Sequence, residues 1–279
     1  MAQPMGRPRQ DERAEAKGAM SSTTPELTPS AGDATSVAAP APPAPPAPPR
    51  LHGLDVVLTV VAGGLCLIAA LYTVKMVLGA QRLALVAKGQ DPPAMILLFS
   101  VFFAAVAVAV WVGVVRHGRT ASGLLGLRRF AVRWWWLAPL CTLLLSVAMD
   151  EVLLRLVRVL FNTDLTPQTS HVIAALATTL PLALAATLTI GLLGPFAEEL
   201  LFRGLIYGYV DGRFGARAAW ATSSILFAAA HAEPAHIALV LPIGILLGWV
   251  RLRSGSLWPC VLAHVINNTL VVWWAYLDP

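Results

Sequence analysis

The sequence has few charged residues. Asp, Glu, Lys and Arg make up only 13% of its 279 residues, whereas about a quarter of the residues of a soluble domain are charged. Hydrophobic residues account for 57% of the chain. So few charges cannot cover a water-exposed surface, which excludes an ordinary soluble domain. We therefore expect membrane lipid to cover much of the surface.

Cysteine is also scarce, and the three cysteines lie far apart in apolar runs, at Cys66, Cys141 and Cys260. This spacing excludes a disulfide framework and a cysteine-rich metal knuckle. The formal net charge is +5, but no nucleic-acid motif or interleaving of aromatic and basic residues accompanies it. Because the basic residues stand in short loops between apolar runs, the charge indicates membrane orientation, and we expect no nucleic-acid partner.

The first 50 residues lack an apolar run, which excludes a signal peptide there. They hold Ser, Thr, Ala and mixed charges, followed by a Pro/Ala repeat that ends at Arg50. Such a segment buries too little apolar area to offset the entropy lost on ordering. We expect a disordered cytoplasmic tail at 1–50, N-terminal transmembrane helices at 51–165 and a second transmembrane group at 166–279.

The later apolar runs are long enough to cross a hydrocarbon core, which takes about 20 helical residues. The sequence therefore predicts an all-α fold, a polytopic transmembrane bundle of about seven to eight helices. The predicted helices lie near 54–80, 92–115, 133–157, 171–190, 193–211, 216–232, 236–252 and 257–277.

The stretch 171–211 is ambiguous because it contains Pro181, Gly191, Gly194 and Pro195. It could hold two short helices, or one long helix preceded by a re-entrant segment. If it crosses the bilayer once, all the arginine-rich loops fall on the same side as the N-terminus, whereas two crossings would split them. We therefore predict seven crossings of the cell membrane, with the N-terminus in the cytoplasm.

Ionisable residues within a membrane are candidates for function, because a charge at mid-bilayer costs about 3 kcal/mol or more. Glu198 and Glu199 are adjacent, and Arg203 follows Glu199 by four residues. Residues at this spacing share a helix face, so Glu199 and Arg203 are expected to form an ion pair. Glu198 points about 100° away and stays free to take and give protons, as a general base must.

Two further polar sets follow. His231 ends the apolar run that contains Phe227, and His264 stands one helical turn before Asn268. Histidine and asparagine can donate hydrogen bonds to a developing oxyanion. Two histidines and a glutamate could equally hold zinc.

Each set also has a purely structural interpretation. The two glutamates and the arginine could form a structural ion pair, and His231 could be an interfacial residue at a helix end. His264 and Asn268 could form hydrogen bonds between membrane helices. His236 follows a proline in a short loop, where we expect it to be solvated. The presence of all three sets within about 75 residues favours a functional site.

Together, the three sets resemble the motifs of the CPBP family of intramembrane proteases, also called the Abi or CAAX-protease family. The residues that carry this resemblance are Glu198-Glu199-x-x-x-Arg203, Phe227-x-x-x-His231 and His264-x-x-x-Asn268. The resemblance covers roughly residues 170–277, and makes 166–279 the expected catalytic core. It adds nothing about the first half of the chain.

The resemblance implies an endopeptidase mechanism. Glu198 would be the general base on a water that His231 orients, and His264 and Asn268 would stabilise the oxyanion. Glu199, Arg203 and Phe227 would support these groups. The family has been described both as metalloproteases and as glutamate proteases. Because Glu198 cannot readily be both a zinc ligand and the general base, we expect no tightly bound metal. If zinc is present, its ligands would be Glu198, His231 and His264.

The substrate and two rival functions remain open. CAAX substrates are prenylated, and the Ala-, Arg- and Pro-rich composition is typical of bacteria, where prenylation is not expected. We therefore expect an unidentified protein or peptide substrate. Buried carboxylates and histidines also mark ion paths, so a transporter or proton relay is one alternative. A non-catalytic membrane scaffold or bacteriocin self-immunity protein is the other.

Overall fold

The structure, a computed structural model, describes residues 50–162 and 166–278. Within these ranges the chain consists of helices and loops, which confirms the all-α prediction. The described residues fall in one compact unit, 47–279. Apart from Arg50, the predicted tail at 1–50 lies outside the described residues, and the predicted division near 165 stays a prediction.

The first half of the chain forms a hairpin of two long helices and then a separate helical rod. In the hairpin, α1 bends at Gly79, which has a φ of 74°. The rod runs without interruption from Trp134 to Phe161 and passes through a π-helical stretch. The elements are α1 (Gly53–Ala87), α2 (Pro92–Val114), η1 (Val115–Thr120), α3 (Ala121–Leu124), α4 (Trp134–Val147), η2 (Ala148–Leu153) and α5 (Leu154–Phe161).

The second half carries the three motifs. Its elements are α6 (Gln168–Leu176), α7 (Leu180–Ala186), η3 (Thr187–Leu193), α8 (Gly194–Glu199), η4 (Leu200–Ile206), α9 (Tyr207–Phe214), α10 (Ala216–Ala229), α11 (Pro234–Ser254) and α12 (Trp258–Leu277). The elements α7 to α9 follow one another without a break and form one rod. The ambiguous stretch 171–211 is therefore one long helix preceded by the short helix α6.

Two prolines are compatible with this long rod. Pro181 stands where its missing N–H is not needed, and the carbonyl that Pro195 leaves free accepts a side-chain hydrogen bond from α12. Pro181 lies in the first turn of α7, and Pro195 lies in the first turn of α8, directly after the π-helical stretch η3. Pro181 is in the first turn of the whole rod and so removes no hydrogen bond from it. The rod can therefore pass both prolines.

Five helices among the described residues are long and apolar enough to cross a membrane. They are Gly53–Ala87, Pro92–Leu124, Leu180–Phe214, Pro234–Ser254 and Trp258–Leu277. Shorter apolar helices, Trp134–Val147 among them, accompany these five. The chain is a membrane protein, while the number of crossings and the side on which the N-terminus lies stay predictions.

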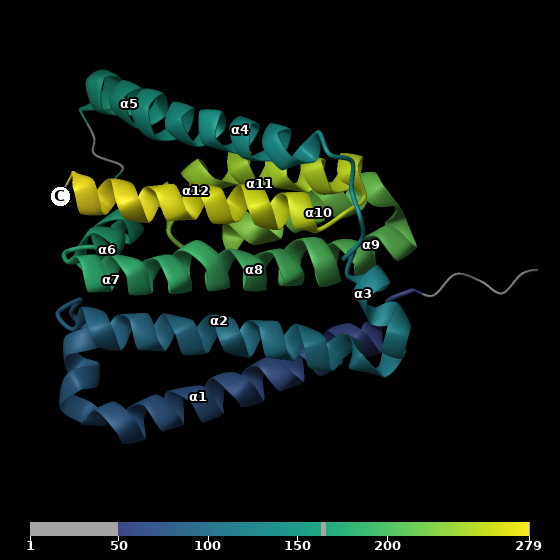
Figure 1. Ribbon diagram of the computed structural model, residues 1–279, viewed down its shortest axis with the longest axis horizontal. Coiled ribbons are helices and arrows are strands. Elements are labelled where there is room, and N and C mark those ends of the chain that lie inside the picture. Colours follow the sequence, from purple (N-terminus) through teal and green to yellow (C-terminus); the bar gives the residue numbers. More distant parts are fainter. Residues whose placement is uncertain (1–49, 163–165, 279) are drawn as a thin grey trace, which may run out of the picture. The chain divides into compact units, whose positions relative to one another are not determined.

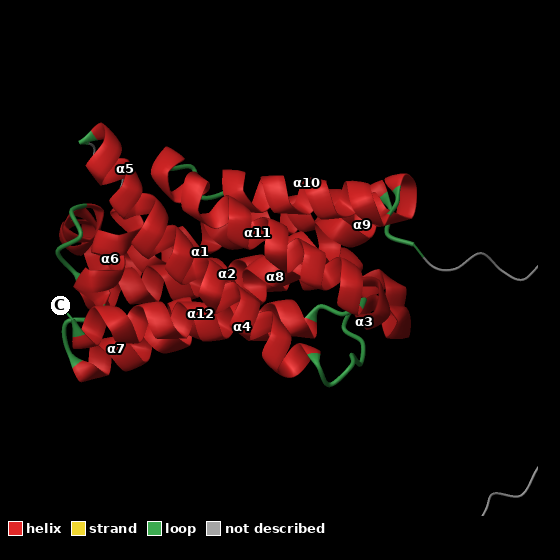
Figure 2. Ribbon diagram, turned by 90° about the horizontal axis from the view of Figure 1, so that it is seen from above, coloured by secondary structure: helices red, strands yellow, loops and turns green. Residues whose placement is uncertain are grey.

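Helix packing brings the three motifs together. In Figure 1, α12 lies alongside the α7–α8 rod, and the α1–α2 hairpin lies on the other side of that rod. Helix α10 packs against α11 and η4, and α4 packs against α12. Figure 2 shows the same helices from above, with only short loops between most of them. The middle of α12 therefore meets α8, and the end of α10 meets the same region.

Small residues allow this close approach. A Cβ atom built on Gly244 of α11 would lie 2.9 Å from Cδ1 of Phe227, and one built on Gly208 of α9 would lie 3.0 Å from the carbonyl oxygen of Leu124. Backbones that approach so closely leave no room for a side chain. The glycine ridges of α9 and α11 thus hold the helices that bear the motifs against their neighbours.

Candidate active site

Glu199 and Arg203 form the ion pair expected from their spacing. Nη1 of Arg203 lies 2.9 Å from Oε1 of Glu199, and both side chains are fully buried. Nη2 of Arg203 donates to the carbonyl oxygen of Gly244 at 2.9 Å. The arginine therefore links the α8–η4 segment to α11 as well as neutralising one carboxylate.

His264 of α12 contacts both glutamates through different ring nitrogens. Nδ1 lies 3.0 Å from Oε1 of Glu199, within hydrogen-bond distance. Nε2 lies 3.8 Å from Oε2 of Glu198. A distance of 3.8 Å is too long for a direct hydrogen bond, but a water beside this gap can bond to both atoms.

The two adjacent glutamates have different surroundings. The Glu199 side chain has no exposed surface, whereas 24% of the Glu198 side chain is exposed. Consecutive residues on a helix point about 100° apart, and this rotation separates the two carboxylates. The Glu199 carboxylate is therefore enclosed by Arg203 and His264. The Glu198 carboxylate is accessible and lies beside Nε2 of His264.

Phe227 connects the two histidines. Its ring centroid lies 5.1 Å from that of His231 and 5.7 Å from that of His264, in both cases edge to face. The guanidinium carbon of Arg203 lies 4.2 Å from the centre of the same ring. Because Phe227 is buried, it fixes the positions of three polar side chains from three different elements.

His231 lies just beyond the end of α10, at an exposed turn. Its Nδ1 is 2.9 Å from the carbonyl oxygen of Phe227, which can only accept a hydrogen bond, so Nδ1 carries the proton of the neutral ring. Its other nitrogen, Nε2, is then an acceptor. Glu198 is near enough for electrostatic interaction with His231. The structure thus brings Glu198, His231 and His264 into one region.

Asn268 of α12 forms a hydrogen bond to the rod that carries the glutamates. Its amide donates to the carbonyl oxygen of Ile190 at 3.4 Å. In the π-helical stretch η3 hydrogen bonds reach back five residues, as from Gly194 to Thr189. The residue five after Ile190 is Pro195, which has no N–H. Asn268 therefore bonds a carbonyl that the proline leaves free, and among the described residues its side chain forms no hydrogen bond to a histidine ring.

His236 was expected in a solvated loop, and this expectation is wrong. It lies in the first turn of α11, which begins at Pro234, and it is half-buried. Its ring centroid is 4.5 Å from that of His231, and its Nδ1 is 2.9 Å from the hydroxyl oxygen of Thr169 in α6. A proline followed by an apolar run is a helix-start signal that could have placed His236 on the helix.

Glu198, His231 and His264 are the predicted ligands if zinc is present. Among the described residues, no three His, Cys, Asp or Glu side chains are grouped as metal ligands. The Nδ1 atoms of both His231 and His264 are already hydrogen-bonded. Zinc in proteins takes at least three side-chain ligands at close range. The Nε2 atoms of both rings keep a lone pair, and metal-ligating histidines typically donate their other ring N–H to a carbonyl or a carboxylate, as these two do. The expectation of no tightly bound metal therefore stays a prediction.

Part of the chain is similar to known proteins. Residues 180–270 match the family model described as type II CAAX prenyl endopeptidase Rce1-like. Over 81 residues, the chain is 31% identical to the protein named "Putative membrane peptidase YdiL" of Bacillus subtilis (strain 168). This match covers 29% of the chain and 33% of that relative, so the chain spans about a third of the relative's length. No solved structure matches the chain.

Both comparisons point to the family that the three motifs resemble. The family model covers all of the motif residues, from Glu198 to Asn268. The two helical rods that meet there, α7–α9 and α12, are also those that carry the glutamates and His264. Residues 180–270 of the chain, which hold all of the motif residues, are therefore similar to the type II CAAX prenyl endopeptidases.

Proposed function

We propose that this chain is an intramembrane endopeptidase of the CAAX-protease type, which hydrolyses a peptide bond with Glu198 as the general base. The observation that carries the proposal is the contrast between two adjacent glutamates. Glu199 is enclosed by Arg203 and His264, while Glu198 is 24% exposed and faces the free nitrogen of His264 at 3.8 Å. The matching family is described as an endopeptidase and the relative is named a membrane peptidase, and both descriptions support this function.

The hydrogen bonds assign protons to His264. Glu199 is ionised in its pair with Arg203 and can only accept, so Nδ1 of His264 donates to it. Nε2 of the neutral ring then has a lone pair. Beside the Glu198 carboxylate, this lone pair can help to hold and orient a water. To donate to an oxyanion, Nε2 must first be protonated, and the buried Glu199 carboxylate stabilises the resulting imidazolium.

Before the attack, His264 takes up a proton from solvent at Nε2 and becomes an imidazolium, and it keeps this proton throughout the reaction. Glu198 removes a proton from the water as the water oxygen attacks the peptide carbonyl carbon. The Nε2–H of His264 donates a hydrogen bond to the oxyanion that forms, and His231 orients the attacking water. The carbon–nitrogen bond then breaks, and Glu198 returns its proton to the leaving amine. Every proton removed in the first step is restored in the last.

Asn268 has a supporting part in this proposal. Its bond to the carbonyl of Ile190 joins α12 to η3, directly before the segment that bears Glu198. It therefore acts as a positioning residue, and holds the helix of His264 at a fixed height against the glutamates. Arg203 and Phe227 are positioning residues for the same reason.

The position of the site limits the substrate. Glu198 lies near the middle of the span Leu180–Phe214, so we propose that the substrate is a protein or peptide that reaches the site from the membrane. We further propose that the N-terminus is cytoplasmic, that no nucleic acid takes part, and that hydrolysis needs no tightly bound metal. Lipid surrounds the helices that carry the site.

Hydrolysis can be tested with the purified full-length chain in liposomes. The probes are a CAAX peptide with and without a farnesyl group, and a pool of peptides from digested bacterial membrane proteins, with cleavage products read by mass spectrometry. We expect new peptide ends with the wild type and at least about a hundredfold slower cleavage with Glu198→Gln, because general-base catalysis contributes about 10²–10⁴-fold.

The matched control is Glu151→Gln, which makes the same change in a half-exposed glutamate of the α4–α5 rod. It should cleave at the wild-type rate. Both variants should elute from a sizing column as the wild type does, which separates loss of catalysis from loss of fold. If Glu198→Gln cleaves the probes as fast as the wild type does, the proposal fails.

A further inference from the structure

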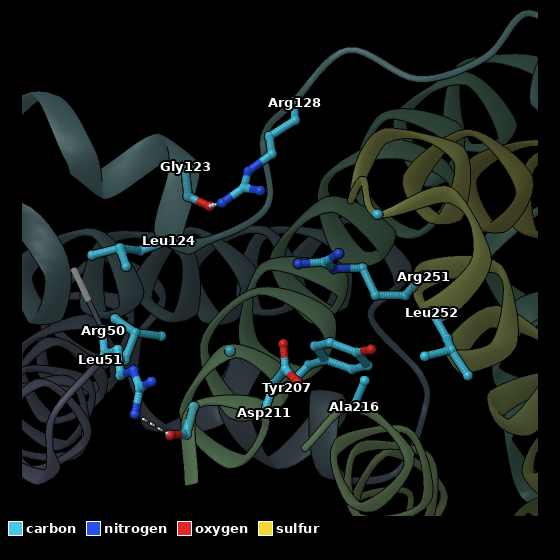
Figure 3. Close-up of a pocket in the computed structure, with 13 residues that line it drawn as sticks. Arg50, Leu51, Gly123, Leu124, Arg128, Tyr207, Asp211, Ala216, Arg251 and Leu252 are labelled. Carbon is cyan, nitrogen blue, oxygen red and sulfur yellow. Dashed lines mark hydrogen bonds between the residues drawn. The ribbon is translucent and has the colours of Figure 1, made fainter. Parts of the chain in front are cut away.

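A cavity lies apart from the glutamates and histidines. It has a volume of about 460 Å³, and five segments line it: the chain before α1, the α3 region, α9, the start of α10 and the end of α11 (Figure 3). None of the motif residues lines it. Tyr207, on its wall, follows Glu199 by eight residues, which is about 12 Å along the helix axis.

The lining of this cavity is strongly basic. It includes Arg50, Arg128 and Arg251 but a single acidic residue, Asp211. The described part of the chain offers none of the three arginines a carboxylate within ion-pair distance. Arg50 donates to the carbonyl of Gly212 at 3.2 Å, and Arg128 to the carbonyl of Gly123 at 3.1 Å. These backbone bonds orient the guanidinium groups without neutralising them.

Arg251 is the most constrained of the three. Only 8% of the residue is exposed, and its Nε donates to the carbonyl oxygen of Arg203 at 3.1 Å. Its guanidinium carbon lies 4.8 Å from the centre of the Tyr207 ring. In Figure 3 the guanidinium extends from α11 toward the side of the cavity that carries Arg128 and Gly123. No described residue accepts a hydrogen bond from its two terminal nitrogens.

Such an arrangement is costly unless an anion completes it. Arginine stays protonated in proteins, so Arg251 cannot shed its charge. A buried charge without a partner destabilises the fold, and a planar guanidinium with two free nitrogens matches a phosphate or carboxylate oxygen pair. With one aspartate against three arginines, the cavity has an excess of two positive charges.

The location of the cavity identifies the source of the anion. Asp211 and Gly212 lie in the last turn of the span Leu180–Phe214, and Arg251 lies in the last turn of the span Pro234–Ser254. The ends of membrane spans stand at the level of the lipid headgroups. Leu51, Leu124 and Leu252 add apolar surface to the lining. Basic pockets between membrane helices at this level suit lipid headgroups.

We propose that this cavity binds the phosphate group of an anionic phospholipid, with Arg251 as its buried anchor and Arg128 and Arg50 at its more exposed side. The Nε atom of Arg251 donates to the carbonyl of Arg203. Arg251 therefore links the bound headgroup to the Glu199–Arg203 ion pair. The proposal does not depend on hydrolysis, because binding is measured directly.

Native mass spectrometry of the full-length chain in a zwitterionic detergent tests the proposal. The probes are dioctanoyl phosphatidylglycerol, dioctanoyl phosphatidylcholine and inorganic phosphate. We expect the phosphatidylglycerol to bind more tightly than the phosphatidylcholine, and millimolar phosphate not to displace it. Arg251→Gln should weaken phosphatidylglycerol binding about tenfold or more, since a hydrogen bond to a charged group contributes about 1.5–3 kcal/mol.

Arg253→Gln is the matched control. Arg253 lies in the same last turn of α11 but is exposed and does not line the cavity, so its loss should change binding by less than about twofold. Arg128→Gln, at an exposed position, covers the case that Arg251→Gln does not fold, and should weaken binding severalfold. If Arg253→Gln and Arg128→Gln weaken phosphatidylglycerol binding equally, the proposed site is wrong. The lipid would then be held by general attraction to positive charge on the protein. Displacement by inorganic phosphate would overturn the lipid as its ligand.

Discussion

Nδ1 of His264 lies 3.0 Å from Oε1 of Glu199, the same oxygen that accepts the hydrogen bond from Arg203. One fully buried carboxylate oxygen thus joins α8, η4 and α12. This oxygen fixes the tautomer of the imidazole and also neutralises the guanidinium. Removing this oxygen should therefore lower the stability of the fold, whether or not it also slows a reaction.

The first prediction concerns this oxygen. In Glu199→Gln the Arg203 guanidinium stays buried without its counter-charge, which typically costs about 3–5 kcal/mol. We expect a markedly lower unfolding temperature in detergent micelles, followed by tryptophan fluorescence. Glu151→Gln breaks an ion pair with the same i, i+4 spacing, but its partners are largely exposed, so the cost should stay below about 1 kcal/mol. Equal losses in the two variants would contradict a structural role for Glu199.

Local spacing could predict part of this site. The Glu199–Arg203 pair follows from a separation of four residues on one helix, which any continuous helix brings onto one face. Sequence could not predict which of the two adjacent glutamates forms the hydrogen bond with His264. That partner depends on how α12 is rotated and shifted along its axis relative to α8. Those quantities arise from packing between helices far apart in the sequence.

Two other residues illustrate the same limit. Asn268 is predicted to donate to an oxyanion, and in the structure its amide bonds the carbonyl of Ile190. That carbonyl is free because a π-helical stretch shifts the hydrogen-bond register just before Pro195. Sequence shows the proline but not the register. For His236, the start of α11 at Pro234 was visible in sequence, but its ring contact with His231 depends on how α10 and α11 pack.

The second prediction concerns the contact between α10 and α11. A methyl group in Gly244→Ala would lie 2.9 Å from Cδ1 of Phe227 and 3.3 Å from the carbonyl oxygen of Ser224. Since Phe227 also contacts both histidines, its ring cannot shift without moving them. We expect a loss of about 1–3 kcal/mol in stability and slower cleavage of the probe peptides.

Gly64→Ala provides the comparison for Gly244→Ala. Gly64 lies in α1, and a Cβ atom there would have no neighbour within 4 Å. The same change should leave both the unfolding temperature and the cleavage rate near the wild-type values. If both variants lose a similar amount of stability, the loss in Gly244→Ala does not come from crowding of the added methyl group. The packing argument for Gly244 would then fail.

The third prediction concerns the acid dependence of stability. Asp91, in the loop before α2, accepts hydrogen bonds from Arg82 at 2.6 and 2.9 Å and from the backbone of Ala94. The Arg82 guanidinium holds the pKa of the Asp91 carboxyl below its usual value. The ionised carboxylate therefore stabilises the fold above its unfolded-state pKa, about 3.9, and this contribution is lost as the pH falls through the folded-state value.

Asp91→Asn should therefore lower the unfolding temperature at pH 7, and the difference from the wild type should shrink as the pH falls below about 4. Asp278→Asn, at the exposed end of α12, should show no such difference at any pH. A gap between wild type and Asp91→Asn that stays constant from pH 7 to pH 3 would show that the carboxylate charge does not stabilise this loop.

The last prediction separates a glutamate protease from a metalloprotease. Both His231 and His264 use Nδ1 in hydrogen bonds, and His264 Nε2 is 3.8 Å from Glu198. A zinc ion ligated by Glu198 would occupy the carboxylate that must act as base, so metal and base roles compete for one side chain. We expect cleavage by the wild type to survive dialysis against EDTA and 1,10-phenanthroline, under conditions that inactivate a soluble zinc protease. If the chelators abolish cleavage and added Zn²⁺ restores it, the histidines and Glu198 bind a metal. Glu198 would then be a metal ligand and not the general base.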